Sequence, residues 1–132
     1  MAEHASDGLG YPVTDVPQSA ASSPDSVIRF LVGELVRQGR VNPEHAERAI
    51  CQVVNRERQG STALGNGAAM PHSTSEVEGV IGIVGRSRTP LPWLGPDGAP
   101  VREVCLLLTP VDQPREAMQA LKNTVAVLQG KA

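Results

Sequence analysis

Two stretches in the first half of the chain place apolar side chains at the spacing of an α-helix. Ser23-Pro24 precedes the first stretch and Asn42-Pro43 precedes the second, and both pairs are typical of a helix N-cap followed by the first helical position. A glycine suited to end a helix follows each stretch. The apolar positions are 27, 28, 31, 32, 35 and 36 before Gly39, and 46, 50, 53 and 54 before Gly60. We therefore predict two successive helices.

Two apolar stretches in the second half are too short for helices and are rich in β-branched residues. VIGIVG at 80–85 is apolar at every position, as in an interior strand, and VREVCLLL at 101–108 predicts a second strand. Pro96-Asp97-Gly98 suits a tight turn and a hairpin with residues 91–94. An amphipathic helix is predicted from residues 112–114 to Gly130. This order of elements predicts an α/β fold, a mixed β-sheet flanked by helices, in a single domain.

The first 23 residues are rich in Gly, Pro, Ser, Asp and Ala. Such a composition buries little apolar surface, so we expect residues 1–23 to form a flexible N-terminal tail. Within it, YPVTDV at 11–16 is the only candidate for a short edge strand. The domain itself is expected to span residues 24–132.

Charge and composition exclude several classes of partner. The 132 residues carry a formal net charge of -2 and contain one Trp, one Tyr and one Phe, so there is neither a basic surface nor a set of stacking aromatics for nucleic acid. The longest apolar runs are far shorter than a membrane span, which predicts no membrane insertion. The first residues lack the pattern of a secretory signal, and we expect a cytoplasmic protein.

The cysteines and histidines show no metal-ligand spacing. Cys51 and Cys105 lie far apart in apolar segments, and we expect both to be reduced and buried. His4 belongs to the predicted tail, and His45 lies in the first turn of a predicted helix, where a solvated side chain is the simplest interpretation. No metal and no cofactor are predicted.

The segment GSTALGNGAAMPH at 60–72 combines small residues and three glycines with a single histidine at its end. A surface turn with an exposed histidine is the simplest interpretation of such a segment. The alternative is a phosphoryl site, because neutral imidazole is a good nucleophile near pH 7 and His72 could hold a phosphoryl group. Backbone N–H groups of a glycine-rich turn and a guanidinium are suitable donors to phosphate. Arg56 and Arg58 end the preceding helix, although Arg58 is equally compatible with a solvated surface charge.

The run RERQGSTALGNGAAMPH at 56–72 resembles the signature of the type 2 enzyme IIA domains of the phosphotransferase system, of the fructose, mannitol and nitrogen-regulatory type. The segments PWLGPDGAPV at 92–101 and VCLLLTP at 104–110 resemble the hairpin and the strand that follow in that family. The resemblance covers roughly residues 24–129. It implies that His72 is the phosphoryl acceptor and that Arg56 stabilises the active site. It also implies that five residues shape the loop around it: Ser61, Thr62, Gly65, Asn66 and Gly67.

The resemblance further implies a phosphocarrier. Such a protein accepts a phosphoryl group from the small phosphohistidine carrier protein and passes it to a IIB domain, or uses it as a signal toward a regulated protein. The family commonly places a second histidine on the turn into the last helix, where this chain has Ala117 or its neighbour Met118. Two alternatives therefore stay open. One is a regulatory binding module that keeps the IIA fold with weak or no transfer, and the other is a small α/β domain without phosphoryl chemistry.

Overall fold

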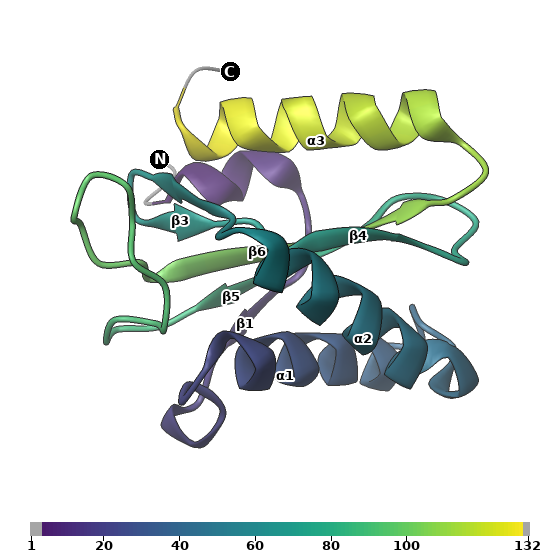
Figure 1. The fold of residues 1–132 in the computed structure, drawn as a ribbon, viewed down its shortest axis with the longest axis horizontal. Helices are drawn as coiled ribbons and strands as arrows, with labels where there is room; N and C mark the ends of the chain where they lie inside the picture. The colour runs from purple at the N-terminus through teal and green to yellow at the C-terminus, as the bar shows by residue number, and fades with distance from the viewer. Residues whose placement is uncertain (1–3, 131–132) are drawn as a thin grey trace.

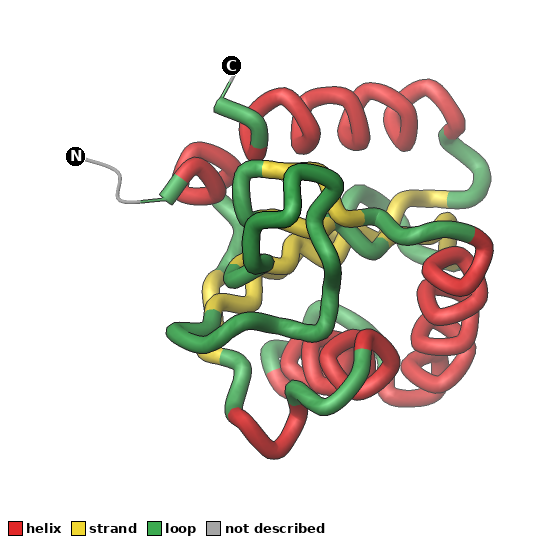
Figure 2. The backbone as a smooth tube through the Cα atoms, turned by 60° about the vertical axis from the view of Figure 1, so that its left-hand side comes forward, coloured by secondary structure: helices red, strands yellow, loops and turns green. Residues whose placement is uncertain are grey.

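A mixed β-sheet of six strands lies between two layers of helices in the computed structural model, which describes residues 4–130 (Figure 1). Helices α1 and α2 cover one face of the sheet, and α3 with the short 3-10 helix η1 covers the other; Figure 2 shows the same separation from a second direction. The helices are η1 (Ala5–Leu9), η2 (Gln18–Ala20), α1 (Pro24–Arg37), α2 (Pro43–Gln59) and α3 (Pro114–Leu128). The strands are β1 (Val13–Asp15), β2 (Ala63–Gly65), β3 (Ala68–Ala69), β4 (His72–Ser75), β5 (Ile81–Arg86) and β6 (Glu103–Pro110).

The predicted helix starts are confirmed, including their caps. The Ser23 side chain accepts a hydrogen bond from the backbone N–H of Ser26 at 3.1 Å, and the Asn42 side chain accepts one from that of Glu44 at 2.9 Å. Each cap satisfies a backbone donor that the helix leaves unpaired, and the proline that follows needs no such partner. The third helix begins at Pro114, as the sequence indicates.

Strand β6 is the centre of the sheet. It pairs with β5 in antiparallel fashion and with β3 and β4 in parallel, which confirms a mixed sheet. All eight of its residues are buried. Side chains alternate along a strand, so Val104, Leu106 and Leu108 join the apolar cluster under α1 and α2. Cys105 and Leu107 join the cluster under α3.

The N-terminal segment differs from the expected tail. Strand β1 pairs in parallel with β5, which confirms the candidate edge strand, and η1 packs against α3. Gly82 and Gly85 of β5 make room for this segment, because a Cβ at either position would lie 2.7 Å from Tyr11 or Val16. The hydroxyl of Ser6, which is 1% exposed, donates to the carboxylate of Glu103. Composition alone does not reveal these contacts, since each depends on a residue distant in sequence.

Three local expectations need correction. The glycine-rich segment is not all loop, since β2, β3 and the first residue of β4 lie within it. The expected strand at 91–94 is reduced to one isolated bridge between Leu94 and Pro100. Cys51 is exposed on α2, while Cys105 is buried as expected.

Candidate functional site

His72 is the first residue of β4 and lies opposite Leu107 of β6. Its ring atom Nδ1 is 2.8 Å from the backbone carbonyl oxygen of Met70. A carbonyl oxygen can only accept a hydrogen bond, so Nδ1 carries the proton and donates it. The lone pair of the neutral ring is then on Nε2. His72 as a whole is partly exposed.

A path of hydrogen bonds connects the end of α2 with the imidazole. The Glu57 carboxylate accepts from the backbone N–H of Thr62 at 2.9 Å and from its hydroxyl at 2.5 Å. The Thr62 carbonyl accepts from the N–H of Met70 at 3.1 Å. Met70 in turn accepts, through its own carbonyl oxygen, the hydrogen bond from Nδ1 of His72. The end of α2 is therefore connected to the imidazole through Thr62 and Met70.

The two arginines at the end of α2 have different surroundings. Arg56 donates from Nη1 to the carbonyl oxygen of Gly60 at 3.0 Å, at the start of the loop that leads to His72. One such contact leaves most of its five N–H donors free for an anion. Arg58 instead forms an ion pair with Asp25 of α1 at 2.9 Å and is largely exposed, as a surface charge would be.

The five predicted loop residues divide into two groups. Thr62 lies on the hydrogen-bonded path, whereas Ser61 stands just before it, and the Ser61 hydroxyl accepts from the N–H of Ala63 at 3.2 Å. The remaining three, Gly65, Asn66 and Gly67, form a tight turn between β2 and β3, with φ of 84°, 60° and 78°.

The contacts of this turn lead away from the imidazole. The Asn66 N–H donates to the Asp97 carboxylate at 3.2 Å, and the Asn66 side chain donates to the carbonyl of Leu128 at 3.1 Å. Ala68, just after the turn, is in register with residue 103 of β6, whereas His72 is in register with residue 107. Four steps of about 3.3 Å along a strand separate the two places by roughly 13 Å. The turn therefore shapes the sheet edge, and its described hydrogen bonds do not reach the ring.

The imidazole lies on the face of the sheet that α3 covers. Met70, two residues earlier, belongs to the apolar cluster under α3, and Ser75, three residues later, lines a cavity beside α2. Both relations place His72 on the α3 side, because side chains alternate along a strand. Ala117 is in the first turn of α3 and is 6% exposed, so its methyl group points into the protein. From the family resemblance we predict that residue 117 lies within side-chain reach of the ring.

Sequence reasoning did not assign a role to two residues that support the site, Glu57 and Trp93. The indole Nε1 of Trp93 donates to Glu57 at 3.1 Å, so one carboxylate holds both the loop after α2 and the segment before β6. The available signals were weak. Glu57 stands among other charged residues at a helix end, and Trp93 is the only tryptophan in a turn-rich segment.

Residues 4–130 contain neither a cluster of metal-ligating side chains nor a membrane-spanning helix. No group of three or more His, Cys, Asp or Glu side chains in this range could hold a metal ion. None of the helices there is long and apolar enough to cross a membrane.

Several known proteins are similar to this chain in sequence. Residues 14–132 match the family model described as Phosphoenolpyruvate-dependent sugar phosphotransferase system, EIIA 2. A nitrogen regulatory protein of Bradyrhizobium diazoefficiens is 30% identical over 122 residues, which are 89% of this chain and 80% of that protein. A nitrogen regulatory protein of Escherichia coli is 34% identical over 71 residues, which are 52% of this chain and 44% of that protein.

Solved structures agree in fold. The nitrogen regulatory protein IIA-Ntr of Neisseria meningitidis has a TM-score of 0.71 at 24% identity, over 91% of this chain and 86% of that one. IIA mannitol of Escherichia coli has a TM-score of 0.59 at 20% identity, over 89% and 86%. The complex of enzyme IIAMtl with phosphorylated enzyme IIBMtl from the same species has a TM-score of 0.55 at 19% identity, over 83% and 81%. The chain thus belongs to the EIIA 2 family of the phosphoenolpyruvate-dependent sugar phosphotransferase system, a family with phosphocarrier and regulatory roles.

Proposed function

We propose that Nε2 of His72 accepts a phosphoryl group from the phosphohistidine of a small carrier protein. The observation that carries this proposal is the 2.8 Å contact between His72 Nδ1 and the Met70 carbonyl, which leaves the lone pair on Nε2. In the step, this lone pair attacks phosphorus and the N–P bond of the donor breaks. The donor imidazole keeps the electron pair of that bond. The proton stays on Nδ1, and its hydrogen bond to the Met70 carbonyl stabilises the positive charge of the ring as the new bond forms.

Arg56 is the residue we assign to the charge of the transferring group. Its guanidinium is fixed at the start of the loop by the 3.0 Å contact with Gly60, and its free N–H groups suit phosphate oxygens. The onward acceptor is a IIB domain or a regulated protein, in keeping with the IIA–IIB complex among the similar structures. We place the exchange in the cytoplasm, and it requires neither metal nor cofactor.

A second candidate function is a regulatory binding module with the same fold and weak or no transfer. Ala117 supports it, because a methyl group at the first turn of α3 offers no hydrogen bond to a phosphoryl group. The curated relatives named as nitrogen regulatory proteins are compatible with either role.

Incubation with the general phosphotransferase enzyme, the carrier protein and phosphoenolpyruvate tests the proposal. We expect one phosphate on His72, stable in base and labile in acid, and none in His72→Ala. Arg56→Ala should slow the transfer by about one to three powers of ten, which is the scale of a lost electrostatic contact to the transition state. Arg58→Ala is the matched control, since it removes an arginine of the same helix turn that pairs with α1. Phosphate on another residue would refute the assignment of His72. Equal transfer rates in the two arginine variants would refute the assignment of Arg56.

A further inference from the structure

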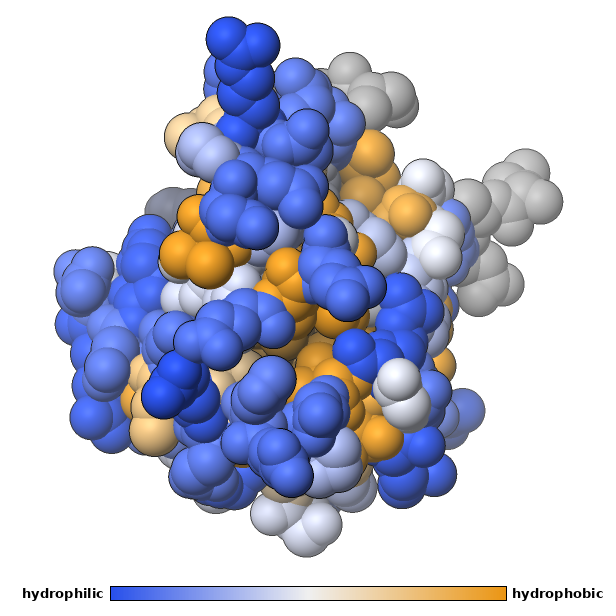
Figure 3. Space-filling model, turned by 90° about the vertical axis from the view of Figure 1, so that its right-hand side faces the viewer, coloured by the Kyte–Doolittle hydropathy of each residue, from blue (hydrophilic) through white to orange (hydrophobic). Residues whose placement is uncertain are grey.

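A cavity of about 350 Å³ lies between the turn from α1 to α2 and the loop from β4 to β5. Figure 3 turns this end of the molecule toward the reader and shows apolar surface sunk between hydrophilic side chains. The apolar part of the cavity comes from Val41, Ala49, Ile81 and Leu108. Its volume is within the range of small-molecule sites. It is separate from the phosphoryl site, because it lies on the α2 side of the sheet and His72 lies on the α3 side.

The hydroxyl of Ser75 is a polar group in this cavity that the fold does not use. Ser75 is only 6% exposed, it lines the cavity, and its side chain has no hydrogen-bond partner among the described residues. The Ser75 hydroxyl is not one of the buried polar atoms that lack a partner, so it stays within reach of solvent or of a molecule in the cavity. It is therefore available to donate a hydrogen bond to a ligand.

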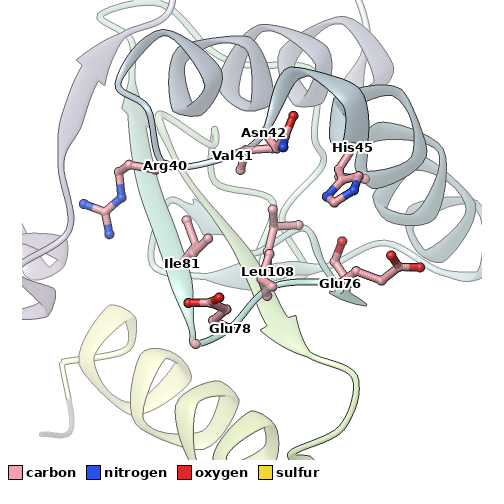
Figure 4. Close-up of a pocket in the computed structure, with 12 residues that line it drawn as sticks. Arg40, Val41, Asn42, His45, Glu76, Glu78, Ile81 and Leu108 are labelled. Carbon is pink, nitrogen blue, oxygen red and sulfur yellow. The ribbon is translucent and has the colours of Figure 1, made fainter.

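Charges of both signs stand at the rim. Arg40 and Glu78 lie at one side of the cavity, and His45 and Glu76 lie at the other (Figure 4). Glu76 is already occupied by an ion pair with Arg48 of α2, at 2.6 Å. In the described part of the chain, by contrast, neither Arg40 nor Glu78 forms an ion pair. A guanidinium and a carboxylate that line the same side of the cavity suit a ligand that carries charges of both signs.

From these features we infer that the cavity binds a free α-amino acid with an aliphatic side chain. The ligand carboxylate pairs with Arg40, and the ligand ammonium pairs with Glu78. The aliphatic side chain covers Ile81 and Leu108, which point into the centre of the cavity in Figure 4, and Ser75 supplies a hydrogen bond. The inference does not depend on phosphoryl transfer, so the two can fail separately.

NMR titration of the full chain with L-leucine tests this site. We expect saturable shifts of the Ile81 and Leu108 amides with a Kd on the order of 1 mM, as befits a small ligand in an open cavity. Three probes each lack one part of leucine: 4-methylpentanoate lacks the ammonium, 3-methylbutylamine lacks the carboxylate and glycine lacks the side chain. Each should bind at least about fivefold more weakly than leucine. Equal binding of any one of them would overturn the assignment of the ligand class.

Two pairs of variants locate the contacts. Arg40→Gln should weaken leucine binding about tenfold, whereas Arg37→Gln, which removes an arginine paired with Glu34 of the same helix, should leave it unchanged. Ser75→Ala should weaken binding about fivefold, and Ser73→Ala in the same strand should not. Circular dichroism of each variant verifies the fold. Absence of saturable shifts at ten times the expected Kd, or equal effects within either pair, would refute the proposed site.

Discussion

Replacement of Glu57 by alanine should destabilise the protein and disturb His72 together. The carboxylate accepts two hydrogen bonds from Thr62 and one from the indole of Trp93. Thr62 is buried, so its N–H and hydroxyl cannot turn to water once the carboxylate is gone. The substitution therefore removes the group that holds the loop between α2 and the imidazole.

The magnitude follows from the two Thr62 donors. A buried donor without a partner costs about 1–3 kcal/mol. The two donors belong to one residue and can relax together, so we expect their combined cost to be about 2–4 kcal/mol, less than twice the upper value. The indole of Trp93 loses its acceptor as well, which places the total in the upper part of this range. For a chain of 132 residues this loss lowers the midpoint of thermal unfolding by roughly 10 °C.

Glu57→Gln is the matched control. An amide oxygen at the position of Oε2 accepts from both the Thr62 N–H and the Trp93 indole. The amide NH2 at the position of Oε1 can donate to the Thr62 hydroxyl, which is able to accept as well as donate. All three contacts persist without charge, so this variant should lose only about 1 kcal/mol.

Urea unfolding followed by circular dichroism at 222 nm measures both variants, and the phosphorylation rate gives an independent readout. We expect the alanine variant to accept phosphate more slowly than the glutamine variant, because Thr62 no longer fixes the Met70 backbone through the Met70 N–H. Equal stability of the two variants would refute the reasoning, since it would mean that the carboxylate contacts do not hold the loop.

Three further substitutions or labelling experiments test other parts of the structure. Gly33→Ala should stabilise the protein by about 0.5–1 kcal/mol in the same urea assay, because a methyl group there meets no atom within 4 Å in an exposed helix interior; a loss of stability would contradict this. Iodoacetamide at pH 8 should label Cys51 alone in the native protein and both thiols after unfolding, because burial raises the pKa of Cys105 to about 12 and keeps it protonated. Ala117→His should speed phosphorylation of His72, by up to about a hundredfold, through an added hydrogen-bond donor; an unchanged rate would argue against residue 117 as the neighbour of the ring.

The helices and the central strands could be predicted from the sequence because their signals are local. Ser23 and Asn42 are caps within three residues of the donors they satisfy, and the apolar run of β6 reflects burial on both faces. The roles of His72 and Arg56 stay predictions from the family motif, and of the loop residues it indicated, Thr62 lies on the hydrogen-bonded path to the ring.

The remaining features depend on residues that are distant in sequence. Glycines at 65 and 67 indicated a tight turn, but only the register of β3 and β4 on β6 shows that the residue after the turn lies four positions along β6 from His72. The N-terminal segment looked unstructured because its partners, Gly82 and Glu103, lie about 70 to 100 residues away. Glu57 was missed for the same reason, since nothing near it in sequence shows that Trp93 is its neighbour.

The contact between Trp93 and Glu57 gives the protein an internal optical probe. The chain has one tryptophan, so the tryptophan fluorescence of the protein comes from one known place. That place is the contact of Trp93 with Glu57, the carboxylate that also holds the loop leading to the imidazole. Indole emission responds to the charge and hydration of its immediate surroundings. Any binding event or phosphorylation that displaces this loop should therefore be followed in real time on the unlabelled protein, without an attached dye and without a second tryptophan to subtract.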